Sequence, residues 1–302
     1  MRIFVTGASG FIGSAVVPEL IGAGHKVVGL ARSDASAAVL TAAGAEVQRG
    51  DLDDLGSLRD GAAGSDGVIH LAFVHDFSAY EKAIRTDLTA IETLGAALEG
   101  SDRPLVIASG TLGLSAGGRT ATEKDGTAPG QSASPRAAAA DLTISLAARG
   151  VRSSVVRLSP SVHGVGDHGF MAALIGIARA KGVSGYIGDG ANRWSAVHRL
   201  DAARLFRLAA EQAPAGSTLH GVADEGVPIR AVAELIGRHL DLPVAAVAPE
   251  NAAEHFGWLG AFLGFDSPAS SALTRDLLGW QPTGPGLLDD LEEGHYFREP
   301  SA

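Results

Sequence analysis

The sequence of 302 residues contains no cysteine. This absence excludes disulfide bonds, thiolate metal sites and cysteine nucleophiles together. No apolar run reaches 18 uninterrupted residues, so no segment is predicted to span a membrane. Basic residues are also scarce: 24 Lys and Arg against 34 Asp and Glu give a net charge of −10. That balance argues against nucleic acid or an anionic membrane as the main partner.

The N-terminus, MRIFVTGASG, has one basic residue and then a strand-like run with glycines. This is not the layout of a signal peptide, so we expect a cytoplasmic location. Hydrophobic residues make up 46% of the chain and charged residues 19%, enough apolar material for a sizeable core. The length fits one large α/β unit, or a main domain with a smaller satellite.

Short apolar runs alternate with amphipathic segments in the first half of the chain. Strands are predicted at Arg2–Val5, Lys26–Leu30, Ala45–Gln48, Gly67–His70, Leu105–Ala108 and Ser153–Leu158. Helices are predicted at Ile12–Ile21, Ala35–Ala43, Leu55–Ala62, Tyr80–Leu98 and Arg136–Arg149. This alternation predicts an α/β fold with a parallel, doubly wound Rossmann sheet.

The alternation of predicted strands and helices ends near Gly164, where glycine-rich and aromatic loops begin. We predict a dinucleotide-binding domain over residues 1–163, to which residues 195–222 return. Residues 164–194 and 223–302 are predicted to form a smaller, mostly helical substrate-binding lobe. No linker cleanly divides the chain, so the two lobes are expected to interleave in the sequence.

The segment TGASGFIG follows the first predicted strand and opens the first predicted helix. Its glycines allow a tight turn, a close approach of the backbone to a pyrophosphate, and close helix–strand packing. The start of the helix then presents free N–H groups and a positive dipole end to the phosphates. We therefore predict a dinucleotide cofactor contacted by Gly7, Ser9, Gly10, Phe11, Ile12 and Gly13.

The end of the second predicted strand, GLARSD, indicates which dinucleotide binds. Ala31 occupies the position where an acid would hold the ribose of NAD, and Arg32 and Ser33 follow it. An arginine and a serine there can bind a 2′-phosphate, which favours NADP(H). In the alternative, Arg32 is a solvated surface residue and Asp34 is the ribose ligand.

Several motifs resemble those of extended short-chain dehydrogenases/reductases, the group that includes NAD-dependent epimerase/dehydratase-like proteins. They are TGASGFIG, GDLDD at 50–54, HLAF at 70–73, SVHG at 161–164, AVHRLDAARL at 196–205 and LGWQP at 278–282. The resemblance implies an adenine site at Asp51 and Leu52. It places Leu71, Ala72 and Phe73 along the middle of the cofactor, with Pro160 and Val162 near the nicotinamide. It also implies a homodimer through the helices predicted at Tyr80–Leu98 and Arg136–Arg149.

The catalytic Tyr-x-x-x-Lys of that family is missing. The three tyrosines, Tyr80, Tyr186 and Tyr296, are followed four positions later by Ile84, Gly190 and Pro300. The family's motif would be expected in SASPRAAAAD at 132–141. This segment is typical of a helix start, with Ser134 as the N-cap and Pro135 in the first turn, and the helix is predicted to end at Gly150. Arg136 and Ala140 stand there in place of the tyrosine and the lysine. Arginine is permanently charged and only donates, so Arg136 cannot act as a general acid.

Other polar residues must then carry any chemistry. The family's serine position falls on Gly110, which leaves the neighbouring Ser109 and Thr111 as candidates, Ser109 also as a cofactor contact. His75 follows the HLAF segment, and His163 lies in PSVHGVGDHGF, each placed to reach the nicotinamide. No metal-ligand set is visible.

Two functions follow from this pattern. The first is an atypical NADPH-dependent reductase acting on a small or medium carbonyl, imine or activated alkene. The second is a non-catalytic NADP(H)-binding redox sensor.

GLSAG at 113–117 matches the G-x-S-x-G elbow of hydrolases, but a polar loop follows Ser115 where that motif needs a helix, so we interpret the match as chance.

Overall fold

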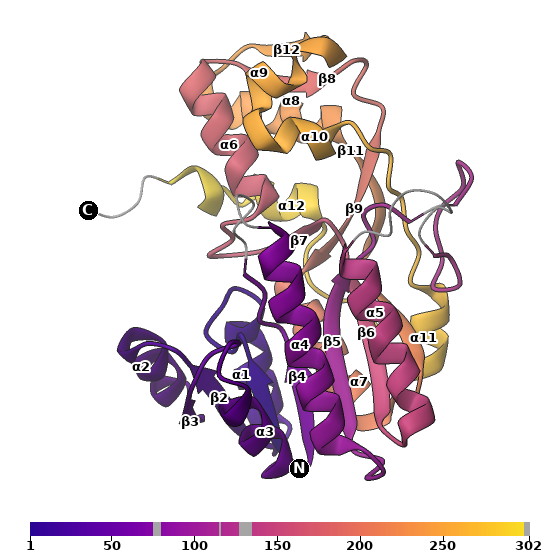
Figure 1. Ribbon diagram of the computed structural model, residues 1–302. Helices are drawn as coiled ribbons and strands as arrows, with labels where there is room; N and C mark the ends of the chain where they lie inside the picture. Colours follow the sequence, from indigo (N-terminus) through magenta and orange to yellow (C-terminus); the bar gives the residue numbers. More distant parts are fainter. Residues whose placement is uncertain (75–79, 115, 127–134, 299–302) are drawn as a thin grey trace.

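The computed structural model describes residues 1–74, 80–114, 116–126 and 135–298 (Figure 1). Its strands are β1 (Arg2–Thr6), β2 (Lys26–Ala31), β3 (Glu46–Arg49), β4 (Gly67–His70), β5 (Pro104–Gly110), β6 (Arg152–Leu158), β7 (Ser161–His163), β8 (Ser184–Ile187), β9 (Arg193–His198), β10 (Ser217–Gly221), β11 (Asp224–Pro228) and β12 (Val244–Val247). Its α-helices are α1 (Gly13–Gly22), α2 (Asp34–Ala42), α3 (Leu55–Ala63), α4 (Tyr80–Leu98), α5 (Pro135–Ser145), α6 (Phe170–Lys181), α7 (Arg199–Gln212), α8 (Ile229–Leu240), α9 (Ala252–Phe256), α10 (Gly260–Leu263), α11 (Ala272–Leu278) and α12 (Leu287–Glu292).

A seven-stranded sheet in the order β10-β6-β5-β4-β1-β2-β3 forms the centre of the fold, and every neighbouring pair in it is parallel. The interior strands β1 and β4 are apolar on both faces because helices cover the sheet on both sides. Helices α1, α2 and α7 contribute to the core on one face, and α3, α4 and α5 to the core on the other. The predicted doubly wound parallel sheet is thereby confirmed.

A second group of elements lies at the carboxyl ends of the sheet strands, at the top of Figure 1. It has its own apolar core, drawn from residues between Met171 and Leu291. The strands β11, β9 and β7 form one small sheet and β12 and β8 another. None of these short strands was predicted, and β8, β11 and β12 lie wholly within the lobe that was expected to be mostly helical. Strand β12 (VAAV) is only partly buried, so it lacks the strong apolar signal of an interior strand.

The segment that follows α11 is held against α7 by buried hydrogen bonds. The indole Nε1 of Trp280 donates to the carbonyl of Asp201 at 3.0 Å, and the Asp201 carboxylate accepts from the backbone N–H groups of Thr283 and Gly284 at 2.9 and 2.8 Å. These bonds fix the segment LGWQP against the helix that covers the sheet.

Helix α5 occupies the position predicted for Arg136–Arg149, but its last turn, Leu146–Arg149, is a 3₁₀-helix. Gly150 ends it in the left-handed region with φ of 73°, as the sequence predicted. The predicted N-cap, Ser134, lies outside the described residues. Among the residues described, no helix is long and apolar enough to cross a membrane.

Candidate active site

The glycine-rich loop joins β1 to α1 and lies against the end of β4. Gly7 has φ of +67°, and a Cβ atom there would lie 2.6 Å from the backbone nitrogen of Ala72. A Cβ atom at Gly13 would lie 2.1 Å from the Gly7 carbonyl oxygen. Both positions therefore exclude a side chain, and the backbone of the loop is held close to Leu71 and Ala72.

The outer side of this loop is open. Gly10 is exposed, and a Cβ atom there would meet only the Gly7 carbonyl, at 3.2 Å. The backbone N–H groups of Phe11 and Ile12 have no backbone acceptor among the described residues, and no side chain caps α1. The loop thus presents free N–H donors and the positive end of α1, the arrangement that binds phosphate groups. Ser9 lies half-buried beside it.

The end of β2 carries the residues predicted to choose the cofactor. Ala31 is buried, and Arg32 is exposed and forms no ion pair with any described residue. Ser33 is the N-cap of α2, accepting from the Ser36 N–H at 3.2 Å. Asp34, the alternative ribose ligand, is engaged in an ion pair with Arg49.

The predicted adenine residues follow β3. One carboxylate oxygen of Asp51 accepts from the backbone N–H groups of Asp53 and Asp54, both at 2.9 Å, so Asp51 shapes the turn that leads into α3. Leu52 packs against the apolar core on the α3 side of the sheet.

A buried network that the sequence did not predict supports the middle of the site. The Thr6 hydroxyl lies 2.7 Å from Nδ1 of His70, and Nε2 of His70 lies 3.1 Å from the Asp87 carboxylate. Nε2–H therefore donates to Asp87, Nδ1 accepts from Thr6, and the Thr6 oxygen accepts from the Ala72 N–H at 3.3 Å. The network ties β1, β4 and α4 together directly beneath Leu71 and Ala72. Its only sequence signal is a histidine at the end of a buried strand.

The two hydroxyl candidates lie at the end of β5. Thr111 is fully buried, and its hydroxyl lies 3.3 Å from the Ser195 hydroxyl on β9. Its carbonyl accepts from Ser267 at 3.4 Å, so Thr111 joins three segments far apart in the chain. Ser109 is 8% exposed, one position before the end of β5. A hydroxyl both donates and accepts, so both side chains have the chemistry to bind an oxygen, although Thr111 has no exposed surface in this structure.

His163 is fully buried on β7 and faces α12. Its Nδ1 donates to the Asp290 carboxylate at 2.8 Å, and its Nε2 has no partner among the described residues. Because side chains alternate along a strand, Val162 points to the opposite face, where it packs against the core that includes Ile12. The two neighbouring candidates thus lie on different sides of β7. Pro160, just before this strand, is half-buried.

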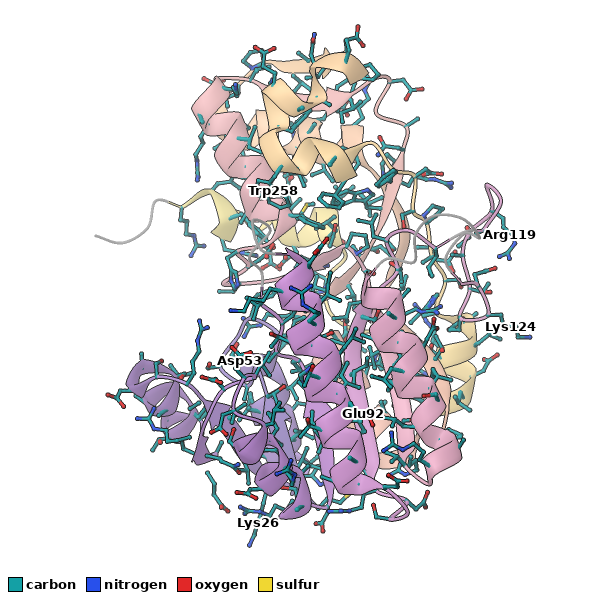
Figure 2. All side chains as sticks on the ribbon, viewed as in Figure 1. Lys26, Asp53, Glu92, Arg119, Lys124 and Trp258 are labelled. Carbon is teal, nitrogen blue, oxygen red and sulfur yellow. The ribbon has the colours of Figure 1, made fainter. Side chains whose placement is uncertain are left out.

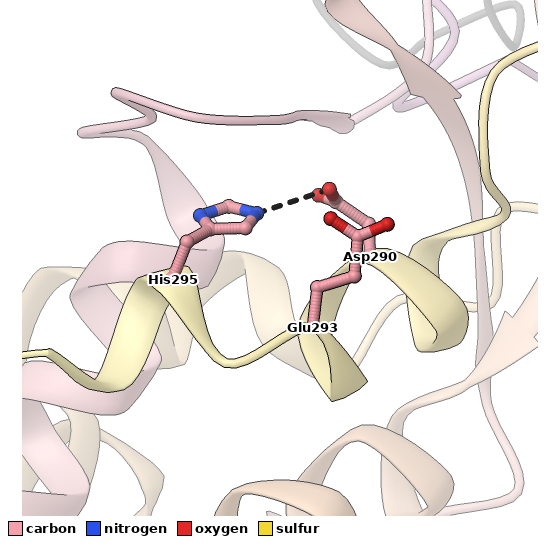
Figure 3. A group of neighbouring side chains, drawn as sticks. All are labelled: Asp290, Glu293 and His295. Atoms are coloured by element: carbon pink, nitrogen blue, oxygen red, sulfur yellow. Dashed lines mark hydrogen bonds and ion pairs between the residues drawn. The ribbon is translucent and has the colours of Figure 1, made fainter.

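Asp290 also accepts from Nε2 of His295, at 3.0 Å (Figure 3). Potential ligand atoms of Asp290, Glu293 and His295 lie within 4.8 Å of one another, although no metal-ligand set was predicted. Both Asp290 oxygens already accept hydrogen bonds from histidines, and Glu293 is exposed. Hydrogen bonding therefore accounts for this cluster without a metal ion.

An aromatic cluster lies in the group of elements above the sheet. The ring of Phe170 has its centroid 5.2 Å from that of Trp194, 5.6 Å from that of Trp258 and 6.3 Å from that of Phe262. Trp258, labelled in Figure 2, is 48% exposed. Leu112, next to Thr111, packs against the same apolar core, which links this cluster to the end of β5.

Two of the positions singled out in the sequence, His75 and Ser115, lie outside the described residues. Arg136 lies in the first turn of α5. Phe73 is half-buried after β4. His198 caps α7 by accepting from the Leu200 N–H at 3.4 Å, and so links the end of β9 to the start of α7.

Comparison with known proteins identifies the family. The sequence matches the NAD dependent epimerase/dehydratase family over residues 3–220, and the chain belongs to that family. It is 52% identical to an uncharacterised protein of Schizosaccharomyces pombe over 98% of this chain and 100% of that one. It is 29% identical to 4-hydroxy-2-methyl-3-oxo-4-farnesyl-3,4-dihydroquinoline-1-oxide ketoreductase of Stigmatella aurantiaca, over 72% of this chain and 66% of that one.

Solved structures share the fold. DesIV, the dTDP-glucose 4,6-dehydratase of Streptomyces venezuelae with NAD and TYD bound, superposes with a TM-score of 0.76 over 98% of this chain and 97% of that one, at 21% identity. The resemblance to extended short-chain dehydrogenases/reductases is confirmed, and the chain has the oxidoreductase fold of that group.

Proposed function

We propose that this protein binds NADP(H) and reduces a small or medium apolar carbonyl, imine or activated alkene. The observation that carries the proposal is the glycine loop, where Gly7 and Gly13 leave no room for a side chain beside an uncapped α1. A dinucleotide diphosphate is the ligand that such a loop fits. The NAD bound by DesIV, a protein of the same fold, supports a nicotinamide cofactor.

Selection of NADP(H) over NAD(H) is assigned to Arg32 and Ser33. Arg32 is an exposed arginine without an ion-pair partner among the described residues, and Ala31 offers no carboxylate that would repel a 2′-phosphate. A guanidinium beside a serine hydroxyl suits a phosphate group. Asp34, the only acid of GLARSD, is already paired with Arg49.

The bound cofactor would supply hydride, and the protein would position the acceptor and furnish hydrogen bonds. Thr111 and Ser109 are the hydroxyls assigned to the substrate oxygen, with Thr111 held by Ser195 and Ser267. By the resemblance, Ala140 stands where the lysine of the usual dyad would be, and its side chain lies in the apolar core beside α4. Without that acid, the enzyme would favour substrates that carry their own activation.

The substrate is assigned to the lobe formed by residues 164–194 and 223–302, where the partly exposed Trp258 and its aromatic neighbours offer apolar contacts. The name of the Stigmatella aurantiaca relative describes a ketoreductase with a farnesylated quinoline substrate, which is consistent with an apolar acceptor.

We further assign the protein to the cytoplasm. We also assign it to a homodimer formed through α4 and α5, which light scattering would detect.

The proposal is tested by following NADPH oxidation against a panel of ketones, aldehydes, imines and enones. Turnover of at least one apolar member supports the reductase. Binding of NADPH without turnover of any member contradicts the reductase and favours the second candidate, a redox sensor. The buried Ala140 at the lysine position is also consistent with a sensor, because a sensor needs no catalytic lysine. A sensor must be stabilised differently by NADPH and NADP⁺, so equal melting temperatures with the two would contradict that candidate.

A further inference from the structure

Phe11 of the glycine-rich loop is flanked by side chains from a much later part of the chain. The His168 ring lies edge-on, with its centroid 5.8 Å from that of Phe11. The guanidinium carbon of Arg199 lies 5.2 Å from the Phe11 centroid, on the ring face. Arg199 is the first residue of α7, and α7 packs along α1, so the two helices begin side by side.

The Arg199 side chain is fixed by the segment that precedes α6. Its Nη1 donates to the Val165 carbonyl at 2.7 Å. Gly164 has φ of +132°, and a Cβ atom there would lie 3.0 Å from Cγ of Arg199, so the backbone passes directly over the arginine stem.

A second pair of bonds holds that segment in turn. The Tyr296 hydroxyl accepts from the Gly164 N–H at 3.1 Å and donates to Asp167 at 2.8 Å. Asp167 also accepts from the Gly169 N–H, at 2.6 Å. The segment 164–169 is thus anchored to the C-terminal part of the chain, and the arginine it holds has a defined position.

Arg199 differs from the arginines near it in having no counter-ion among the described residues. Arg193 pairs with Asp266, and Arg207 pairs with Glu19 and Glu211. Arg199 makes one hydrogen bond, to a neutral carbonyl, although its side chain is half-buried. This half-buried cation, without a carboxylate among the described residues, lies over the ring of Phe11. The backbone N–H groups of Phe11 and Ile12 in turn have no backbone acceptor in the described part of the chain. The two features together favour an anion near the start of α1.

We propose that Arg199 is a ligand of the cofactor diphosphate and acts opposite the start of α1. The inference rests on the proposed binding of a dinucleotide, and it adds a charged side chain to a loop whose own donors are backbone N–H groups and the Ser9 hydroxyl. NADPH and NADH share this diphosphate. Arg199 therefore contributes to affinity for both and does not discriminate between them, whereas Arg32 contributes to NADPH alone.

The test is the substitution Arg199→Gln, which removes the charge but keeps a polar side chain with an amide N–H donor. Dissociation constants are measured by fluorescence titration for NADPH and NADH. Loss of a charge-assisted hydrogen bond predicts that both affinities fall about 10-fold to 100-fold, with their ratio unchanged. Arg199→Lys keeps the charge and should recover part of the loss.

Arg230→Gln is the matched control, because Arg230 also lies over an aromatic ring, that of Tyr186, but on α8 and paired with Glu234. It should leave both affinities within about twofold of the wild type, as expected for a surface substitution. Adenosine 2′-monophosphate, which has no diphosphate, should bind Arg199→Gln as it binds the wild type.

Unchanged NADPH affinity in folded Arg199→Gln would overturn the role of Arg199 while leaving the proposed function intact. Equal loss of adenosine 2′-monophosphate binding would also overturn it, since that loss would report a general distortion of the site. A wild-type protein that binds neither dinucleotide would contradict the proposed function itself.

Discussion

His163 and Asp290, which lie 127 residues apart in the sequence, share a buried hydrogen bond of 2.8 Å that joins β7 to α12. Asp290→Asn would leave His163 and His295 without their carboxylate. Removing one partner of such a buried pair costs about 3–5 kcal/mol. Chemical denaturation at neutral pH should show a loss of unfolding free energy in this range, and a loss below about 1 kcal/mol would contradict the importance of the pair.

The same pair predicts how stability depends on pH. Burial alone would raise the pKa of Asp290, but the hydrogen bonds from His163 and His295 outweigh it, so the pKa lies below its ordinary value of 3.8. A carboxyl with a lowered pKa stabilises the fold above its unfolded pKa, and this contribution is lost as the pH falls through its folded pKa. The stability difference between wild type and Asp290→Asn should therefore be full at pH 5 and shrink below about pH 4. A difference that stays constant down to pH 3 would contradict this assignment.

Gly13→Ala tests the glycine loop. The new Cβ atom would lie 2.1 Å from the Gly7 carbonyl oxygen, so the loop must shift. We expect a stability loss of about 1–3 kcal/mol from overpacking, and a fall of more than about tenfold in NADPH affinity. Gly22→Ala, at the other end of α1, is the control, because a Cβ atom there meets nothing within 4 Å. NADPH binding that survives Gly13→Ala unchanged would place the cofactor elsewhere.

Thr6→Val tests the network beneath Leu71 and Ala72. The change keeps the shape of the side chain but removes the hydroxyl, which leaves His70 Nδ1 and the Ala72 N–H unpaired in the core. The cost should be about 1–3 kcal/mol in denaturation experiments. Thr41→Val, on the exposed side of α2, should change stability by less than about 0.5 kcal/mol. Equal effects of the two substitutions would mean that the network adds nothing.

Thr111→Val tests the proposed substrate contact. If its hydroxyl binds the substrate oxygen, kcat should fall about 100-fold while the Kd for NADPH stays unchanged. Ser195→Ala removes only the neighbour of that hydroxyl and should have a smaller effect. Full activity in Thr111→Val would leave Ser109 or a bound water as the source of the contact.

The sequence predicted the parts of the fold that depend on local pattern. The buried run of β1, the glycines at 7, 10 and 13, and the Gly150 end of the α5 region are visible in the sequence because each depends on its neighbours in the chain. The strands β8 and β12 were missed, since their residues become partly buried only after they pair.

Long-range contacts at the site were also beyond the sequence. Nothing near His163 indicates that it faces Asp290, and nothing near Phe11 indicates Arg199, because these partners meet only once α12 and α7 have packed. The histidine pattern in PSVHGVGDHGF predicted side chains at the nicotinamide. In the structure His163 faces α12 and His168 contacts Phe11 of the glycine-rich loop.

The central claim is that the site at the end of β2 selects NADP(H), and the most direct measurement is the ratio of the dissociation constants for NADH and NADPH in wild type and Arg32→Gln. We predict that the wild type binds NADPH more tightly. Arg32→Gln should weaken NADPH binding about 10-fold to 100-fold and leave NADH unchanged, while Asp34→Asn should change neither. Equal or tighter binding of NADH by the wild type, or a loss of NADH affinity in Asp34→Asn, would contradict the account.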